Sequence, residues 1–475
     1  MRVKFILPAL VEARGESWRP IKYSLFPPLG LATLAGYLRD EDAAEIVDEH
    51  VERLEVEDRP DLVAIETYVT SAKRCYRIAD HYRSRGVHVV LGGLHVTSLP
   101  QEGLEHADTV VTGPAEEAWP RFLADFRAGR PERLYRSSRR DLDDVPLPRR
   151  DLIKARNYLV PNSIVVSRGC PHACDFCYKT SFFQGGRSFY TYAVDRALAE
   201  IQPLRGRHLF FLDDNVFGAP EFAVRLFQEM RNMRRIWQGA STVESVLDTE
   251  VLDAAVASGL KSLFVGFESL DEQALRRHRK SHNRIAEYRH AIRMLHERGV
   301  MINASFVFGL DSDTPSVFDA TVNWAIEMGL ETATFHILTP YPGTPLFERF
   351  EREGRILDRD WDRYDTRHMV FRHPTMSRET IESGYWRAYE RFYRFRSTAR
   401  GAFQKGAFPA ALRHLAYTVA WKKIDPLWSL LIRLRRLACA TPMLERVLLG
   451  RRQGASQSAV RDLTGVRTAQ DVNDM

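Results

Sequence analysis

Three of the five cysteines in this chain lie within eight residues, in the segment Ser167-Arg-Gly-Cys-Pro-His-Ala-Cys-Asp-Phe-Cys-Tyr178. Cys170, Cys174 and Cys177 constrain the chain more than any other feature, because thiolates this close on one loop are typical metal ligands. Such a loop can bind three irons of a [4Fe-4S] cubane and leave the fourth iron open to a small chelating ligand. We therefore expect these cysteines to hold an iron–sulfur cluster.

Two other uses of these thiols are less favoured. A disulfide would leave one of the three thiols unpaired, and cysteines this close along a loop pair only with strain. A structural zinc ion needs a fourth ligand, which His172 could supply, but one compact knuckle without a second ligand pair is unlike a zinc ribbon. The two remaining cysteines, Cys75 and Cys439, are expected to be ordinary buried residues.

The rest of the composition is that of a globular protein with room for two or three domains. The chain has 475 residues, of which 44% are hydrophobic and 27% charged, and its formal net charge is +6. No Lys/Arg run alternates with aromatic residues, so nucleic acid is not an expected partner. The N-terminal apolar segment is cut by Pro8, and no stretch reaches the about 20 apolar residues that span a bilayer. Together with the few, clustered cysteines, this predicts a cytoplasmic location.

Residues 1–135 are predicted to form a doubly wound α/β domain with a parallel sheet. Residues 72–82 carry the apolar stripe of a helix that packs on a sheet. Strands separated by helices imply a parallel sheet, whose ligands bind beyond the carboxyl ends of the strands. The candidate strands are Val3–Leu7, Glu45–Asp48, Leu62–Ile65, Val87–Leu91 and Thr109–Thr112.

Three glycine-rich turns lie near the ends of these segments. They are Pro27-Pro-Leu-Gly30, Gly92-Gly-Leu-His-Val-Thr97 and Gly113-Pro-Ala-Glu-Glu117. Glycine permits a positive φ and lets a ligand approach the backbone closely. Each turn alone is weak evidence, because any α/β domain has some. The candidate cofactor-binding residues in them are Pro28, Gly30, Gly92, Gly93, His95 and Glu116.

A charged, proline-punctuated linker at 136–160 precedes a second α/β domain, at 161–345. Strands alternating with helices predict a partial βα barrel, whose chemistry lies at the carboxyl ends of the strands. The cysteine loop follows the first of these strands, as that rule requires. The candidate strands are Ile164–Ser167, Leu209–Asp213, Ala240–Val243, Leu263–Phe267, Ile302–Phe308 and Thr332–Ile337.

Polar side chains follow two of these strands. Asp213, Asp214 and Asn215 end the second strand, where helix capping is the alternative to ligand binding. Glu268 and Ser269 end the fourth. An ionised Glu after a buried strand is costly unless it is paired, so a ligand or an arginine should accompany Glu268.

The cysteine spacing, with an aromatic residue just before the third cysteine, resembles the radical S-adenosylmethionine (SAM) superfamily. The resemblance implies that SAM chelates the open iron through its amino and carboxylate groups. It also implies that Asp213, Asp214 and Asn215 contact the methionine amino group and that Glu268 and Ser269 contact the ribose or that amino group. Adenine would pack on the side chain of Phe176 and meet the backbone of Tyr178.

The glycine-rich domain ahead of this core resembles the cobalamin-binding domain of one branch of that superfamily. Further similar segments are Gly266-Phe-Glu-Ser269 and Leu338-Thr-Pro-Tyr-Pro-Gly-Thr344. The branch includes hopanoid C-methylases and enzymes of bacteriochlorophyll synthesis. The resemblance implies cobalamin as a cofactor, a reductant such as flavodoxin or ferredoxin, and methylation of an unactivated carbon in a lipophilic or natural-product substrate. Oxidation, cyclisation or rearrangement without methyl transfer is the alternative, and an electron carrier or sensor is disfavoured.

One segment departs from the cobalamin-binding pattern. Domains that ligate cobalt carry an Asp-x-His-x-x-Gly loop, but Asp48-Glu-His-Val-Glu-Arg53 lacks the glycine and follows the second strand. We therefore expect no histidine on cobalt, and we expect His50 to be a surface or packing residue.

The C-terminal region is predicted to be helical over 346–450 and disordered over 451–475. An apolar stripe in it lies beside three arginines, Arg433, Arg435 and Arg436. Two interpretations stay open: a helix packed on the barrel, and a basic amphipathic helix resting on the inner face of a membrane. The stripe consists of Leu427, Trp428, Leu431, Leu434 and Ala438.

Overall fold

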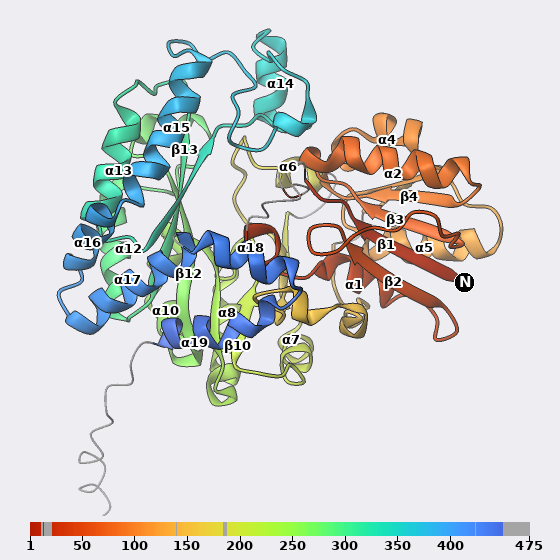
Figure 1. Ribbon diagram of the computed structural model, residues 1–475, viewed down its shortest axis with the longest axis horizontal. Helices are drawn as coiled ribbons and strands as arrows, with labels where there is room; N and C mark the ends of the chain where they lie inside the picture. Colours follow the sequence, from red (N-terminus) through yellow and green to blue (C-terminus); the bar gives the residue numbers. More distant parts are fainter. Residues whose placement is uncertain (11–12, 14–20, 139, 184–187, 423, 450–475) are drawn as a thin grey trace, which may run out of the picture.

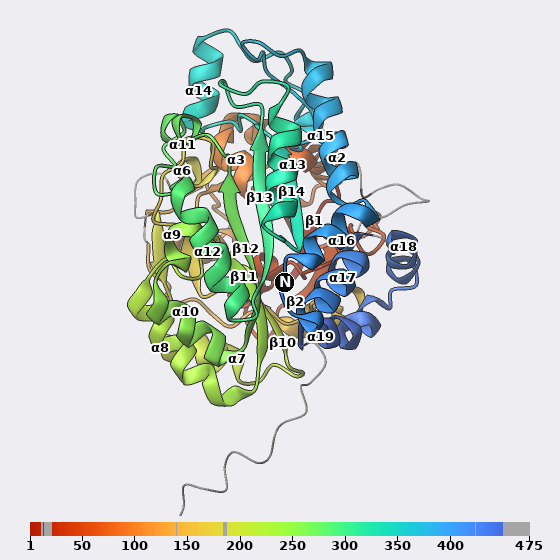
Figure 2. The ribbon, with the colours of Figure 1, turned by 90° about the vertical axis from the view of Figure 1, so that its left-hand side faces the viewer.

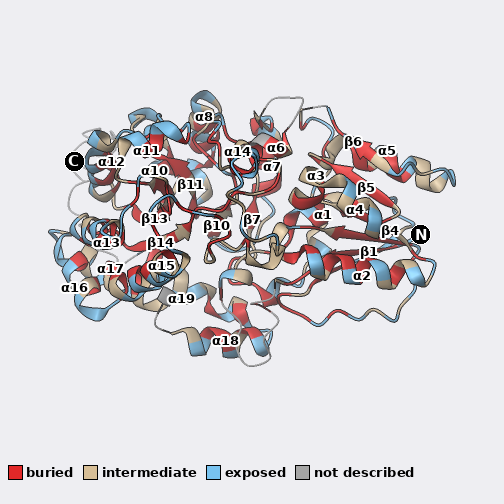
Figure 3. Ribbon diagram, turned by 90° about the horizontal axis from the view of Figure 1, so that it is seen from above, coloured by how far each residue is buried: buried red, intermediate tan, exposed pale blue. Residues whose placement is uncertain are grey.

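The structure is a computed structural model that describes residues 1–475 apart from 11–12, 14–20, 139, 184–187, 423 and 450–475. Figure 1 shows two α/β units side by side, with the C-terminal helices packed against the second unit. Figure 3 shows buried residues running along the strands of both units, while the outer sides of the helices are exposed. The tail predicted to be disordered, 451–475, lies outside the described residues.

The first unit contains a six-stranded parallel sheet with the strand order β2-β1-β3-β4-β5-β6. The first five strands lie on the segments predicted from the sequence. The sequence pattern does not predict β6, because a three-residue strand that ends in a charge has no readable period. The strands are β1 (Arg2–Leu7), β2 (Ala43–Asp48), β3 (Leu62–Glu66), β4 (His88–Gly92), β5 (Thr109–Thr112) and β6 (Leu134–Arg136).

Helices cover both faces of this sheet, which confirms a doubly wound domain. α1 (Leu29–Ala35) and α5 (Ala115–Arg127) share one apolar cluster with the strands, and α2 (Ala72–Ser84) belongs to the cluster on the other face. The neighbours of β1 are β2 on one side and β3 on the other. The strand order therefore reverses at β1, and a ligand crevice is expected at the carboxyl ends of β1 and β3.

The second unit contains a parallel sheet with the order β14-β13-β12-β11-β10-β7, which forms a partial barrel. The predicted first strand, Ile164–Ser167, is wrong as one element. Its chain leaves the sheet at Ile164 and forms a separate antiparallel pair, β8 (Ser167–Gly169) with β9 (Phe189–Thr191). The barrel strands are β7 (Ser163–Ile164), β10 (His208–Phe211), β11 (Ile236–Thr242), β12 (Leu260–Glu268), β13 (Met301–Phe308) and β14 (Thr332–Ile337).

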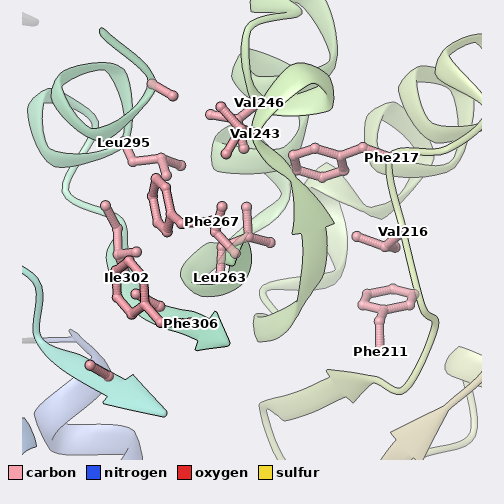
Figure 4. Packing of buried hydrophobic residues seen from close by; sticks show 14 of the residues in the cluster. Phe211, Val216, Phe217, Val243, Val246, Leu263, Phe267, Leu295, Ile302 and Phe306 are labelled. Atoms are coloured by element: carbon pink, nitrogen blue, oxygen red, sulfur yellow. The ribbon is translucent and has the colours of Figure 1, made fainter. Parts of the chain in front are cut away.

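Helices cover the outer face of this sheet (Figure 2). A phenylalanine-rich core lies between the strands and these helices, where Phe211, Phe267 and Phe306 are fully buried (Figure 4). Burying one such side chain contributes about 1.5–3 kcal/mol, so this layer holds the strands in register. The covering helices are α7 (Val194–Ile201), α8 (Pro220–Met230), α10 (Thr249–Ser258), α12 (Ile285–Glu297) and α13 (Val317–Glu327).

The edge strand β14 is covered by α15 (Arg378–Phe392). The Ala333 amide donates to the hydroxyl of Tyr393 at 3.1 Å, and the Phe335 amide donates to the hydroxyl of Tyr389 at 3.1 Å. Backbone groups that would otherwise face another chain are thereby paired. The aromatic C-terminal region thus closes the open side of the barrel.

The predicted C-terminal stripe is wrong as a single face. Its helix, α18, ends at Arg433, so Leu434 and Ala438 lie beyond it. Trp428 is buried, whereas Leu427 and Leu434 are exposed. Among the described residues no helix is long and apolar enough to cross a bilayer. The other C-terminal helices are α14 (Pro345–Arg352), α16 (Phe395–Phe403), α17 (Phe408–Lys422), α18 (Asp425–Arg433) and α19 (Thr441–Leu449).

The two isolated cysteines have different environments. Cys75 is buried in α2, as expected, and its sulfur lies 2.9 Å from the Thr67 hydroxyl. The expectation for Cys439 is wrong, because this residue is exposed in the short turn before α19.

A buried ion pair attaches the turn between α16 and α17 to the start of β14. The Lys405 ammonium contacts the Glu331 carboxylate, and each side chain is 4% exposed. The Ile302 amide donates to the same carboxylate at 2.9 Å. Burial by itself would raise the pKa of Glu331, but the charge of Lys405 holds that pKa well below its usual range.

Replacing Lys405 by Met should therefore lower the free energy of unfolding, by up to about 3–5 kcal/mol, because the buried carboxylate loses its ammonium partner and keeps only the Ile302 amide and two nearby histidines. Urea denaturation of the full chain measures the loss. The Lys405→Met/Glu331→Gln double variant is the control and should lose much less than the single variant. A single variant as stable as the parent would contradict this account of the pair.

Candidate functional site

The cysteine loop leaves the end of β8 and lies at the carboxyl side of the barrel. Gly169, the residue before Cys170, has φ +75°, and a Cβ there would lie 1.9 Å from the Ser188 carbonyl oxygen. Only glycine fits that position. Cys170 and Cys174 are buried, and Cys177 is half-buried. The loop therefore presents three thiols to the interior and not to bulk solvent.

Two buried lysines, Lys179 and Lys280, lie near these thiols. Burial raises the pKa of Cys174 to about 11, and the charge of Lys280 acts in the opposite direction. Burial also raises the pKa of Cys177, against the charge of Lys179. Bare thiolates are therefore costly here, and metal ligation is the state that removes this cost, because a metal deprotonates a coordinating thiol.

The geometry disfavours the alternatives to a cluster. Among the described residues no three His, Cys, Asp or Glu side chains are close enough to hold one metal ion, as a zinc site requires. The described cysteines are all free thiols. His172 stacks on His282, with ring centroids 3.5 Å apart. Three cysteines that ligate a cubane bind three different irons and need not converge on one metal ion.

Glu268 is paired, as the sequence requires, although by lysine and not by arginine. Its carboxylate lies 3.1 Å from the Lys280 ammonium and accepts from the Ser305 hydroxyl at 3.2 Å. Its φ of +64° is strained for a residue with a side chain and turns the carboxylate toward Lys280. The hydroxyl of Ser269 accepts from the Asp271 amide at 3.1 Å and belongs to the turn before the next helix.

The three polar residues after β10 have different environments. Asp213 is buried and accepts from the amide of Val166 at 3.1 Å and from the amide and hydroxyl of Ser167. It therefore attaches the end of β10 to the segment that leads into the cysteine loop. Burial raises the pKa of Asp213 to about 7, while these donors act to lower it. The Asn215 side-chain oxygen accepts from the Ser241 hydroxyl at 3.1 Å.

Asp214, in contrast, is exposed and accepts from the Tyr178 hydroxyl at 3.0 Å. The helix-capping alternative for this segment is wrong, because α8 begins at Pro220 after an Ala219 cap. Phe176 packs on the ring of His278, with centroids 5.9 Å apart. Of the three residues after β10, Asp214 is the one whose carboxylate is accessible to a ligand.

A cavity of about 240 Å³, the first cavity, opens where the three glycine-rich turns meet. Gly93 has φ +106°, and a Cβ there would lie 2.9 Å from the Thr67 backbone nitrogen. Pro28 and His95 do not line this cavity. Its apolar walls come from α1, α5 and the strands. The lining residues include Gly30, Leu34, Ala64, Gly92, Gly93, Val111, Gly113, Glu116 and Trp119.

The carboxylates of Glu66 and Glu116 are among the groups that line the first cavity. One Glu116 oxygen accepts from Arg168 of the barrel at 2.9 Å, and the other is buried with no hydrogen-bond partner among the described residues. Burial raises the pKa of Glu66, whose carboxylate accepts from the Tyr68 hydroxyl at 2.8 Å. The first cavity therefore offers mostly apolar walls and the unpaired Glu116 oxygen, which can accept from a hydroxyl or amide of a bound ligand.

A second cavity, of about 320 Å³, lies between the carboxyl ends of β1 to β4 and the barrel residues Tyr178 and Tyr341. His50 lines it and is a buried packing residue, stacked on Tyr23 at 5.4 Å. His50 Nδ1 lies 2.8 Å from Asp48, which also accepts from the Tyr158 hydroxyl at 3.0 Å. Sequence reasoning missed this group, because Tyr158 belongs to the linker and is far from Asp48 along the chain.

His95 also lines the second cavity, although it was predicted as part of a glycine-rich turn. Its Nε2 lies 3.0 Å from the Glu102 carboxylate, and its Nδ1 has no hydrogen-bond partner among the described residues. Trp361 of the C-terminal region donates to the same carboxylate at 3.1 Å. The C-terminal region therefore contacts the first unit at this point.

Comparison with known proteins identifies both units. The family model of the B12 binding domain matches residues 23–123, and that of the radical SAM superfamily matches residues 164–325. The chain is therefore a radical SAM enzyme. Its first domain places it in the cobalamin-dependent branch, and these domains imply a [4Fe-4S] cluster, SAM and cobalamin as cofactors. Residues 344–433 match a domain of unknown function.

Known relatives share most of this length. The chain is 29% identical to bacteriochlorophyllide d C-12(1)-methyltransferase of Chlorobaculum tepidum, over 70% of this chain and 75% of the relative. It is 24% identical to the anaerobic magnesium-protoporphyrin IX monomethyl ester cyclase of Cereibacter sphaeroides, over 83% of this chain and 70% of that relative. Hopanoid methylases are also distant relatives.

The solved cobalamin-dependent SAM radical enzyme OxsB has the same fold, with a TM-score of 0.65 at 13% identity. The match covers 90% of this chain and 72% of OxsB.

Alanine at Asp213 should lower the free energy of unfolding by about 1–3 kcal/mol, because the buried Val166 and Ser167 amides lose their acceptor. Alanine at Asp214 should leave stability nearly unchanged. If Asp214 holds the SAM amino group, its loss should weaken SAM binding about tenfold to a hundredfold.

Thermal unfolding and calorimetric SAM titration of the same anaerobic, cluster-loaded samples measure both effects. Unchanged SAM affinity in Asp214→Ala would remove this residue from the binding site. Unchanged stability in Asp213→Ala would contradict its structural role.

Proposed function

We propose that this enzyme is a C-methyltransferase that acts on an unactivated carbon of a lipophilic or natural-product molecule. The proposal rests mainly on the position of the second cavity. This cavity lies between the strand ends of the B12 binding domain and Tyr178, the residue that follows the third cysteine of the loop. Relatives named as methyltransferases support it. Oxidation, cyclisation or rearrangement without methyl transfer is the second candidate, favoured by the cyclase among the relatives.

In this proposal Cys170, Cys174 and Cys177 hold the cluster. When bound, the cluster and SAM together supply a carbon-centred radical, and cobalamin supplies the methyl group. Lys179 and Lys280 offset the negative charge of the thiolates, and Glu268 fixes the position of the Lys280 ammonium. A low-dielectric site makes these charge interactions stronger than they would be in water.

The proposed SAM contacts differ in how accessible their side chains are. Asp214 is exposed and would accept from the amino group, while Phe176 and the Tyr178 backbone would contact adenine. Glu268, Ser269 and the internally paired Asp213 and Asn215 shape the pocket, and a direct contact of any of them with SAM stays a prediction. No residue is proposed as a catalytic acid or base.

The proposed cobalamin contacts belong to the first cavity. Gly30, Gly92 and Gly93 let the ligand approach the backbone, and Glu116 would accept from a hydroxyl or amide of the nucleotide. Pro28 stands at the start of α1, where it fixes the turn. His95 faces the second cavity and would lie beside the substrate or the corrin edge.

The proposed substrate site is the second cavity. Its walls are mostly aromatic and aliphatic, with Phe26, Tyr68 and Tyr341 among them, and polar groups are contributed by Asp48 and His50. Such a lining suits a lipophilic molecule with a few polar substituents. A small electron-transfer protein such as flavodoxin or ferredoxin is the proposed reductant, and the cytoplasm is the proposed location.

Methyl transfer should convert one SAM to S-adenosylhomocysteine and a second to methionine and 5′-deoxyadenosine. Holoenzyme, reductant and SAM with a labelled methyl group are incubated anaerobically with a small-molecule extract of cells that lack the protein. Label in an extracted product, with S-adenosylhomocysteine, is the expected result. The second candidate reaction gives 5′-deoxyadenosine, but no labelled product and no S-adenosylhomocysteine.

Cys174→Ala is the control and should give no 5′-deoxyadenosine, because one cluster ligand is lost. SAM cleavage by that variant would contradict the proposed cluster site.

The full chain purified with cobalamin should retain the cofactor, and His50→Ala should retain it equally well. The reason is that His50 is already held by Asp48 and Tyr23. Electron paramagnetic resonance of the cob(II)alamin form shows whether nitrogen is bound to cobalt. A nitrogen coupling that disappears in His50→Ala would contradict this prediction.

A further inference from the structure

The charges of the chain are unevenly distributed. Residues 391–444 contain eleven Lys or Arg and one acidic residue, Asp425, which is a formal excess of ten positive charges. The whole chain has an excess of six, so the rest of it has an excess of four negative charges. Such an asymmetry indicates a surface that meets an anionic partner.

Not all of these cations are available. Four of them pair with acidic side chains that lie outside this range: Arg391, Arg394, Arg400 and Lys405. Four others form no ion pair with any described residue and are exposed. They are Arg396 on α16 and the group Arg433, Arg435 and Arg436 at the end of α18.

The helix next to this arginine group has two unlike faces. Trp428 and Ile432 are 3% and 2% exposed and pack on Ile21, Leu159 and Val160. On the other side Leu427, Leu430 and Leu434 are 44%, 48% and 57% exposed. Leu427 and Leu430 are three residues apart on one side of α18, and Leu434 is the residue directly after the helix. One face of α18 is therefore anchored to the protein, and the opposite face presents leucines to solvent.

A second apolar projection lies at the tip of the α16–α17 hairpin. Phe403 is the last residue of α16 and Phe408 the first of α17, and they are 84% and 79% exposed. Figure 2 shows α16, α17 and α18 toward its right-hand side. We call the exposed surface of these three helices and the arginine group at the end of α18 the basic side.

We propose that the basic side docks on an anionic lipid bilayer. The leucines of α18 and the two phenylalanines would enter the interface, and the arginines would meet lipid phosphates. The charge argues against a second copy of this chain, because a symmetric contact would bring two basic surfaces together. It also argues against cover by residues 450–475, whose sequence is mostly polar.

Residues 344–433, which include α18, match a domain of unknown function. The proposal gives this part of the chain a role. It does not depend on the reaction proposed for the active site. Failure of vesicle binding would leave methyl transfer untouched, and failure of methyl transfer would leave the membrane surface untouched.

Anaerobic co-flotation of the full-length holoenzyme with vesicles tests the proposal. Vesicles of phosphatidylcholine alone are compared with vesicles in which part of it is replaced by phosphatidylglycerol. Binding to the anionic vesicles, weakened by salt, is expected. Arg433→Gln/Arg435→Gln/Arg436→Gln should weaken it by about fivefold per arginine, roughly a hundredfold in all (about 3 kcal/mol). The Leu427→Gln/Leu430→Gln/Leu434→Gln variant should also bind the anionic vesicles more weakly.

Matched controls lie on other segments. Arg39, Arg53 and Arg359 are more than half exposed, and replacing all three by Gln removes the same charge without touching the basic side. Leu357→Gln removes an exposed leucine elsewhere. Thermal unfolding checks that each variant is folded.

Several outcomes would overturn the proposal: no binding at low salt, equal binding to both kinds of vesicle, or equal losses in the control and test variants. A dimer in solution that the leucine variant dissociates, without vesicle binding, would assign the surface to a second copy instead.

Discussion

Strands of a parallel sheet all end at the same edge, and this constraint determines where the chemical groups of the protein lie. Both sheets are parallel, and their carboxyl ends face the region between the two units. Glu268 ends β12, Asp214 comes shortly after β10, and two of the glycine-rich turns lie at the ends of β4 and β5. The cysteine loop is different, because it follows β8 of the antiparallel pair. The buried carboxylate of Asp213 connects one such strand end to the start of the cysteine loop.

Burying charge is costly, and the protein offsets this cost with a partner at each site. Lys280 meets Glu268 beside the thiols, Arg168 meets Glu116 between the two units, and Lys405 meets Glu331 at the far end of the barrel. A pair of this kind adds little net stability over an apolar pair, but losing one member is expensive. The pairs therefore fix how segments are joined and constrain which substitutions the chain tolerates.

The C-terminal region performs two tasks in the structure. Tyr389 of α15 and Tyr393 directly after it cover the free edge of β14, and Trp361 contacts the first domain through Glu102. Its outermost helices then leave leucines, phenylalanines and arginines at the surface. Closing the barrel explains the buried aromatic residues, and the exposed ones are what the bilayer proposal explains.

The sequence by itself determined the features that depend on local order. Cysteine spacing indicated the cluster loop, ten of the eleven strands predicted from apolar segments each overlap a single strand of the structure, and glycine-rich turns indicated the cofactor domain. Short β6 and the break between Ile164 and Ser167 were not predictable, because two or three residues carry no readable period. Likewise, the apolar stripe around Leu427 did not show which side of α18 would be buried.

The tertiary structure decided which polar atoms are engaged and which are accessible. It separates Asp213, Asp214 and Asn215, three neighbours that look alike in sequence, because each faces a different set of donors. It buries His50 through contacts with Tyr23 and, by way of Asp48, with Tyr158. Hydrogen bonds and burial depend on atoms brought together from distant segments, and that information exists only once the chain is folded.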